Sequence, residues 1–374
     1  MPDQRATVDY DLHGLVRVRL LEAGPADAAV VDRQLGPLRT EVGGQPDIVI
    51  RFVDRLEVHG RERLLGAGDA AFTDDAFIIL RAKYRSRTRV SLRLDRLAAQ
   101  PEFVCERGLP AVPYLIPVLN LTALAAEALP LHAAAFEHDG RGVVVTGWSK
   151  GGKTESLLAF TAHGARYVGD EWVYLPPGGQ RVLGIPEPVR LWDWHLAQLP
   201  DARRRAGRRA MVKVSAWQAV ARAASGGRRI LPPGSLPARS ADRILPLLEA
   251  QRHLDLAPAR LFGRTDRPAE GPFDGLCFVA SVAAPDIRVA PVDPLEVAER
   301  MVHSLQYERL DFMALYERFR FAFPEARVPL VEEAEERQRR LLRQRFADKP
   351  AILVEHPYPV SLEALYAAMA AHLR

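Results

Sequence analysis

The predicted fold is decided by one stretch of the sequence, Gly142-Val-Val-Val-Thr-Gly147-Trp-Ser-Lys-Gly-Gly-Lys153-Thr154. The apolar, β-branched run over residues 142–146 predicts a buried strand that leads directly into a glycine-rich loop. Residues 153–162 predict a helix, and Gly164 follows as its C-terminal cap. The stretch therefore predicts an α/β unit in which a loop joins a buried strand to the first turn of a helix.

The loop of this unit has the composition of a phosphate-binding loop. It fits the pattern GxxxxGK[ST], in which glycines let backbone N–H groups surround phosphate oxygens, the lysine reaches the outer phosphates and the hydroxyl holds magnesium. The positive end of the helix dipole would face the phosphates, which favours this interpretation over a purely structural turn. We therefore predict that the chain binds ATP and Mg²⁺. The residues expected to contact the nucleotide are Gly147, Ser149, Lys150, Gly151, Gly152, Lys153, Thr154 and Glu155.

An acidic pair, Asp170-Glu171, follows the loop at the end of a predicted strand that begins at Arg166. If this strand is a parallel neighbour of the strand before the loop, the pair lies beside the triphosphate. One carboxylate could then hold the metal ion, and the other could accept a proton from an incoming hydroxyl. A solvated turn is the alternative interpretation of such a pair.

The order of these motifs resembles the catalytic domain of bacterial HPr kinase/phosphorylase. In that family a histidine on the preceding strand, a GxSGxGKSE loop and a VADD-type acidic pair occur in the same order. Here they correspond to Leu131-His132-Ala-Ala-Ala, within a strand predicted over residues 131–136, to the loop above and to Val168-Gly-Asp170-Glu171. The resemblance covers about forty residues strongly and residues 110–320 weakly. It implies a fold like that of HPr kinase and phosphoenolpyruvate carboxykinase.

The resemblance also implies a role for each matching residue. Asp170 would be the general base toward the acceptor hydroxyl, and His132 would neighbour and orient it. Lys153 would bind the β- and γ-phosphates, while Thr154 and Glu171 would serve the magnesium ion. A satisfied core histidine is the alternative for His132.

The sequence also departs from the family. The loop carries an aromatic residue and an extra cation in Trp148-Ser-Lys150, and the second acid is a glutamate. The glycine-rich signature tied to phosphorylase activity is not recognisable, so we do not predict dephosphorylation. Arg190 is a candidate cation for the transferred phosphoryl group, since charge stabilisation dominates phosphoryl transfer; a solvated surface arginine is the alternative.

The periodicity along the chain predicts three parts. Short alternating segments over residues 1–110 predict a small β-rich N-terminal module. Residues 111–322 would form the α/β (α+β) P-loop catalytic domain. Residues 323–374 predict a helix–strand–helix extension at the C-terminus, whose last helix is capped by Ser361.

Composition excludes several classes of protein. The 374 residues carry 51 basic and 47 acidic side chains, an excess too small and scattered to predict nucleic-acid binding. The most apolar stretch, residues 112–136, is interrupted by prolines and polar residues, so we predict no membrane span. The N-terminus lacks the pattern of a signal peptide, and Cys105 and Cys277 lack metal or redox spacing. These features predict a cytoplasmic protein with free thiols.

Together the motifs predict a kinase that transfers the γ-phosphate of ATP to a hydroxyl of a peptide, a protein or a small molecule. The alternative is a nucleotide-binding regulatory or assembly protein with little or no transfer activity. A GTPase or ATPase motor is disfavoured because no NKxD or ABC-type signature is present. The resemblance to HPr kinase makes a homo-oligomer plausible.

Overall fold

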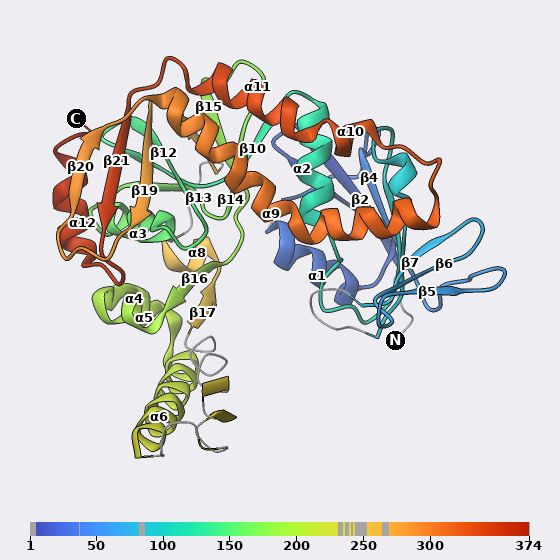
Figure 1. Cartoon of the computed structure of the whole chain (residues 1–374), viewed down its shortest axis with the longest axis horizontal. Coiled ribbons are helices and arrows are strands. Elements are labelled where there is room, and N and C mark those ends of the chain that lie inside the picture. Colours follow the sequence, from blue (N-terminus) through green and yellow to red (C-terminus); the bar gives the residue numbers. More distant parts are fainter. Residues whose placement is uncertain are drawn as a thin grey trace.

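The computed structural model describes residues 5–36, 38–81, 87–230, 235, 239–240, 242–243, 253–263 and 269–373. Within these ranges the chain is a mixed α and β protein whose strands form four sheets of nine, six, four and two strands (Figure 1). The expected α+β class is therefore confirmed.

The N-terminal residues form the nine-stranded sheet, with strand order β3-β1-β2-β4-β9-β8-β7-β6-β5. The helix α1 (Pro25–Leu35) follows β2 and packs into the same apolar core. The strands are β1 (Ala6–Leu12), β2 (Val16–Ala23), β3 (Arg39–Thr40), β4 (Ile48–Val53), β5 (Arg63–Leu65), β6 (Ala70–Phe72), β7 (Phe77–Ile79), β8 (Val90–Leu92) and β9 (Glu102–Glu106). The alternation seen in the sequence thus becomes a sheet with one face in the core.

The glycine-rich loop belongs to the six-stranded sheet, whose order is β13-β11-β12-β19-β21-β20. Its strands are β11 (Ala134–His138), β12 (Arg141–Gly147), β13 (Arg166–Gly169), β19 (Gly275–Ser281), β20 (Arg288–Pro291) and β21 (Ala351–His356). β19 runs parallel to both β12 and β21, whereas β11 is antiparallel to β12. A run of β-branched residues suits β12 because the sheet is covered on both faces.

Helices cover the two faces of this sheet. Val143 and Val145 of β12 share a core with α3 (Lys153–Ala162) and α12 (Leu362–Ala370). Val144, between them, belongs to the core with α9 (Pro294–Ala322) and α11 (Ala334–Phe346). Successive side chains of a strand point to opposite faces, so this alternation sets which helices lie on which side.

A second sheet stands beside the first, with order β10-β14-β15-β18. Its strands are β10 (Leu129–His132), β14 (Trp172–Leu175), β15 (Arg181–Gly184) and β18 (Glu270–Pro272). The chain passes directly between these two sheets three times: after His132, at Asp170-Glu171 and between β18 and β19. The N–H of Ala133 donates to Glu171 O at 3.2 Å, so the first two crossings lie side by side.

Two predictions about these strands are wrong. Residues 131–136 were expected to form one strand, but they divide between β10 and β11 in different sheets. β13 was expected to be the parallel neighbour of β12, but the antiparallel β11 lies between them. The acidic pair still reaches the loop, because β13 runs in the same direction as β12 one strand further away.

The C-terminal residues contribute to the same unit as the loop. β21 pairs with β19, and α12 packs on α3. The boundary predicted at residue 323 therefore falls inside one folded body. The helix α9 continues from the six-stranded sheet to the N-terminal sheet, where Phe319 packs edge-on against Phe77 with ring centroids 5.8 Å apart (Figure 1).

The remaining elements are a small ribbon and several helices outside the three larger sheets. A two-stranded ribbon is made by β16 (Val189–Trp192) and β17 (His253–Leu256), and α6 (Arg208–Ile230) extends away from the sheets (Figure 1). The other helices are α2 (Leu115–Ala125), α4 (Asp193–Gln198), α5 (Pro200–Ala206), α8 (Pro258–Leu261) and α10 (Pro329–Glu332). Throughout the described ranges, every helix is too short or too polar to cross a bilayer.

Candidate functional site

The loop between β12 and α3 has room only for glycine at its two ends. Gly147 has a φ of 156°, and a Cβ there would collide with the carbonyl oxygen of Val279 on β19. Gly152 has a φ of 110°, and a Cβ there would collide with the imidazole of His356. Glycine is needed at these two positions because Val279 on β19 and His356 on β21 lie too close to allow a side chain. The backbone N–H groups at both ends of the loop are therefore not covered by a side chain of their own residue.

Two side chains from distant elements brace this loop. His356, fully buried at the end of β21, has its Nε2 3.0 Å from Gly151 O. The hydroxyl of Ser304 on α9 donates to Gly147 O at 3.3 Å. Neither residue was predicted, because each comes from an element far along the chain and belongs to no local motif.

Lys153 opens α3 and is buried, with 7% of its surface exposed. Its ammonium donates to Trp148 O at 3.0 Å and lies 3.5 Å from Gly147 O. Burial lowers the pKa of Lys153, while Glu171, Glu308 and other nearby carboxylates oppose that shift. The backbone of the loop therefore surrounds the ammonium group of Lys153.

The central contact of the site joins Thr154 to Asp170. The hydroxyl Oγ1 lies 3.2 Å from Oδ1 and 3.1 Å from Oδ2 of the carboxylate. Asp170 is 2% exposed, and burial raises its pKa to about 7, with the charge of Glu171 acting in the same direction. The hydrogen bond from Thr154 acts against this shift.

His132 contacts Glu171, whereas the resemblance implies that it would orient Asp170. The two atoms of that contact, His132 Nε2 and Glu171 Oε2, lie 3.0 Å apart. The other ring nitrogen lies 2.9 Å from Glu308 Oε1, without the alignment of a hydrogen bond. Burial lowers the pKa of His132, but the two glutamates outweigh it and the net shift is upward. The same contact with His132 lowers the pKa of Glu171.

Two further carboxylates that the sequence did not reveal lie near the acidic pair. Glu308, on α9, reaches His132 from the opposite side to Glu171. Glu187 precedes β16, and burial followed by the charges of Glu171 and Asp170 raises its pKa well above the usual range. Asp170, Glu171 and Glu308 therefore act on the charge of Lys153, and Glu187 acts on the acidic pair.

Two residues predicted for the site point elsewhere. Arg190 pairs across the β16–β17 ribbon with Asp255, Nε to Oδ1 at 3.0 Å, although its charge still helps to lower the pKa of Glu171. Glu155 is buried and lies 3.2 Å from the Nε2 of His195 on α4. Glu155 therefore joins α3 to α4, and its charge also opposes the lowering of the pKa of Lys153.

Two other residues of the glycine-rich loop, Ser149 and Lys150, lie at the protein surface. Ser149 is half-buried, and Lys150 is exposed with a left-handed φ of 61°. The N–H of Gly151 donates to Trp148 O at 3.0 Å, which closes a tight turn. Lys150 can therefore reach an anion at the loop without disturbing the core.

The donor set fits magnesium held jointly with phosphates. Among the residues that the structure describes, no group of three or more His, Cys, Asp or Glu side chains is arranged to hold a metal ion alone. Magnesium bound to nucleotides usually takes one or two protein oxygens, with phosphates and waters completing its shell. Thr154 and the adjacent acids provide oxygens of that kind.

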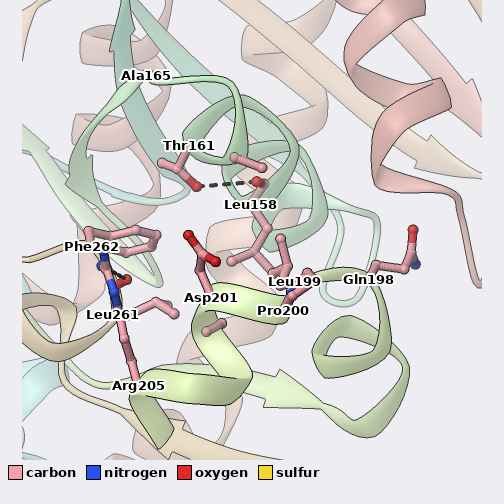
Figure 2. Close-up of a pocket in the computed structure, with 12 residues that line it drawn as sticks. Leu158, Thr161, Ala165, Gln198, Leu199, Pro200, Asp201, Arg205, Leu261 and Phe262 are labelled. Carbon is pink, nitrogen blue, oxygen red and sulfur yellow. Dashed lines mark hydrogen bonds between the residues drawn. The ribbon is translucent and has the colours of Figure 1, made fainter.

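A cavity of about 310 Å³ lies elsewhere, between the C-terminal half of α3, α5 and α8 (Figure 2). Thr161 lines it, and at a rise of about 1.5 Å per residue this side chain lies roughly 12 Å along α3 from Lys153. The hydroxyl of Thr161 donates to Leu157 O, and Arg205 donates to Leu261 O. These polar side chains of the cavity make hydrogen bonds within the fold, so we do not place the candidate functional site in this cavity.

Comparison with known proteins adds no further assignment. No protein-family model matches the chain, and a search of curated proteins found no similar sequence. The resemblance to HPr kinase therefore rests on the motifs alone. The function has to be argued from the geometry of the loop, the acids and the histidine.

Proposed function

We propose that this protein is an ATP-dependent kinase that transfers the γ-phosphate to a hydroxyl acceptor. The observation that carries the proposal is the contact of Thr154 with Asp170 at 3.1 Å. The contact joins a buried carboxylate to a hydroxyl at the end of the glycine-rich loop. A site that only bound nucleotide would not need a second acid, Glu171, held against a histidine at the same place.

The bare loop supports binding of the phosphates. Its glycines lack room for a Cβ, its backbone faces the N-terminus of α3, and Lys153 lies within its curve. Lys153 would turn from the loop carbonyls to the β- and γ-phosphates, and Thr154 with Glu171 would hold Mg²⁺. Bound MgATP supplies the phosphoryl group that is transferred.

Asp170 would accept the proton of the acceptor hydroxyl. It is the acid closest to the loop hydroxyl, and it is shielded from water, which strengthens its interaction with a bound proton. Glu171 is the more exposed acid and is oriented by His132. Arg190 would act through its field on Glu171, and not through contact with the phosphate.

The same motifs support a fold related to HPr kinase and phosphoenolpyruvate carboxykinase. The partner would be a hydroxyl-bearing peptide, protein or small molecule, and a homo-oligomer would agree with that relationship. To these motifs the structure adds β21, which carries His356, and Glu308 on α9.

Calorimetric titration with ATP and Mg²⁺ tests the proposal. The chain should bind, and Lys153→Ala should bind at least about tenfold more weakly, because a charged hydrogen bond contributes about 1.5–3 kcal/mol. Arg203→Ala removes an exposed positive charge on α5, which lies beside the C-terminal half of α3 and not beside the loop, and should bind like the unchanged protein. Equal affinity of the Lys153→Ala and unchanged proteins would mean that the loop is not a nucleotide site.

A further inference from the structure

An exposed aromatic pair stands at the edge of the loop. Trp148, the first residue after β12, and Tyr307 on α9 have ring centroids 4.8 Å apart and planes inclined at 39°. Trp148 is 49% and Tyr307 48% exposed. The two rings touch and together form one exposed apolar surface beside the loop, and contiguous apolar surface of this kind often marks a binding site.

The pair lies at the end of the loop that would hold the terminal phosphates. The carbonyl of Trp148 accepts from the ammonium of Lys153, the group that reaches the outer phosphates. On α9, Tyr307 is flanked by Ser304, which binds Gly147 O, and by Glu308, which contacts His132. An acceptor hydroxyl must approach from this end, whereas the base of the nucleotide extends from the opposite end of the triphosphate.

The charges near the aromatic pair restrict the chemical class of the phosphoryl acceptor. Glu308 follows Tyr307 on α9 and contacts His132, which also contacts Glu171, and the side chains of Glu171 and Glu308 are 47% and 24% exposed. These oxygens accept hydrogen bonds from hydroxyl groups, and they repel a second anion. A flat aromatic surface next to carboxylate oxygens that accept hydrogen bonds suits a ring that has C–H bonds on its face and hydroxyl groups at its edge.

We propose that Trp148 and Tyr307 form the floor of the acceptor subsite and that the acceptor is a neutral sugar. This inference rests on the proposed kinase function. The sugar ring stacks on the aromatic pair, and one of its hydroxyls donates to Glu308. One hydroxyl faces Asp170, which takes its proton; the oxygen bonds to the γ-phosphorus of ATP as the bond to the β–γ bridging oxygen breaks, and ADP leaves.

Saturation-transfer NMR tests the subsite directly. The probes are glucose, N-acetylglucosamine and maltose, each added to the full chain with ADP and Mg²⁺, with the serine-containing peptide Gly-Ser-Gly as a comparison. At least one sugar should receive saturation at its ring C–H protons. In Trp148→Ala and Tyr307→Ala its dissociation constant should rise about 5- to 10-fold, the effect of losing an aromatic contact.

Two controls separate the inference from the proposed function. Phe321→Ala removes a 74% exposed aromatic ring from the same helix and should leave sugar binding unchanged. The affinity for ATP and Mg²⁺, measured by calorimetry, should stay within about twofold in both aromatic variants. A loss of nucleotide affinity in these variants would assign the pair to the base and overturn the acceptor subsite.

The remaining outcomes are also decisive. If no sugar of the panel binds while ATP still binds through Lys153, the sugar inference is wrong and the kinase proposal stands. If the peptide binds and the sugars do not, the acceptor is a peptide. If ATP itself does not bind, the proposed function fails first, and sugar binding to the aromatic pair would then describe a different activity.

Discussion

The hydroxyl of Thr154 lies 3.1 and 3.2 Å from the two carboxylate oxygens of Asp170, although the residues belong to α3 and to the turn after β13. The contact forms because β13 runs in the direction of β12 and ends beside the loop. The contact brings the carboxylate of Asp170 to the end of the glycine-rich loop. The neighbouring Glu171 is oriented separately, by its contact with His132. The two acids therefore occupy different environments one residue apart.

These environments predict different effects of removing each acid. Asp170→Asn keeps the shape but removes the proton acceptor, and general bases contribute about 100- to 10,000-fold, so transfer should fall at least about 100-fold. Glu171→Gln should mainly weaken the binding of Mg²⁺, so that transfer needs a higher Mg²⁺ concentration. Single-turnover transfer from labelled ATP to the acceptor, or to water in its absence, measures both. Near-normal transfer in Asp170→Asn with loss in Glu171→Gln would reverse the two roles.

His132→Ala should act through Glu171. Because the ring contacts Glu171 and not Asp170, His132→Ala combined with Glu171→Gln should cost less than the sum of the two single effects. Combined with Asp170→Asn it should be closer to additive. The double-mutant cycle on transfer rate distinguishes this arrangement from the one expected from the motif, in which His132 would couple to Asp170.

The loop and its helix could be predicted because their signals are local. The glycines, the lysine and the capping glycine stand within a few residues of one another, and α3 has the predicted bounds of Lys153 and Ala162. The partner of His132 could not be predicted, because it depends on which sheet each half of residues 131–136 joins. Glu308 and His356 reach the site from distant segments, and contacts of that kind leave no local pattern.

The collision at Gly152 predicts a specific loss of nucleotide binding. Gly152→Ala places a methyl group against His356, and Gly164→Ala meets nothing within 4 Å, although both glycines have left-handed φ values of 110° and 89°. Both variants should lose about 1–2 kcal/mol of stability from backbone strain. Only Gly152→Ala should also lose affinity for ATP in calorimetry. An unchanged affinity would mean that the loop can shift away from His356 without consequence.

Cys105 and Cys277 should be unreactive in the folded protein. Both are fully buried free thiols, and burial raises the pKa of each. The thiolate is the reactive form, so a thiol reagent such as dithionitrobenzoate should label neither residue until the chain is unfolded in urea. The variant with both residues changed to Ala should bind ATP normally. Rapid labelling of the folded protein would contradict this prediction.

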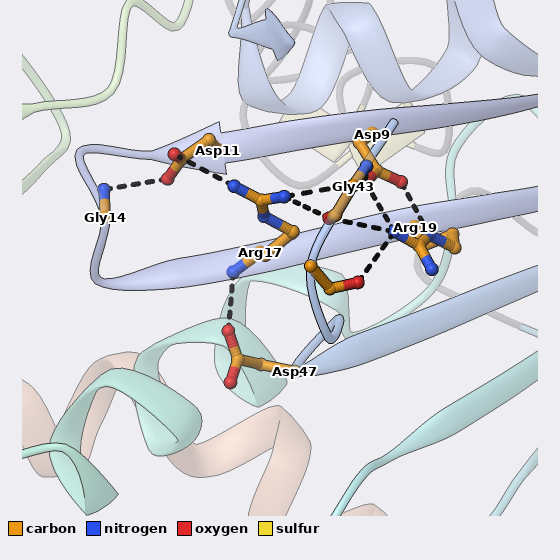
Figure 3. Close-up of polar contacts among 8 residues, drawn as sticks. Asp9, Asp11, Gly14, Arg17, Arg19, Gly43 and Asp47 are labelled. Carbon is orange, nitrogen blue, oxygen red and sulfur yellow. Dashed lines mark hydrogen bonds and ion pairs between the residues drawn. The ribbon is translucent and has the colours of Figure 1, made fainter. Parts of the chain in front are cut away.

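The N-terminal sheet contains an ion pair that should make its stability depend on pH. Asp9 is fully buried, and Arg19 binds both of its oxygens, at 2.8 and 2.7 Å, while the N–H of Gly43 donates to it at 3.1 Å (Figure 3). Arg19 also donates to Gly43 O, so the pair fastens the segment after β3 to the β1–β2 hairpin. The hydrogen bond from Arg19 is the main cause that holds the pKa of Asp9 below its usual value.

A lowered pKa means that the folded protein binds this proton less readily than the unfolded chain. The contribution of Asp9 is therefore complete above its unfolded pKa of about 3.9 and is lost as pH falls through the lower, folded value. At pH 7, Asp9→Asn should cost about 2–3 kcal/mol in urea unfolding, and this difference should shrink below about pH 4. Asp11→Asn, whose contact with Arg17 is 3.6 Å long and partly exposed, should cost less than about 1 kcal/mol at any pH. Equal effects of the two substitutions, or a cost for Asp9→Asn that does not change with pH, would show that the Asp9–Arg19 pair does not hold this part of the sheet together.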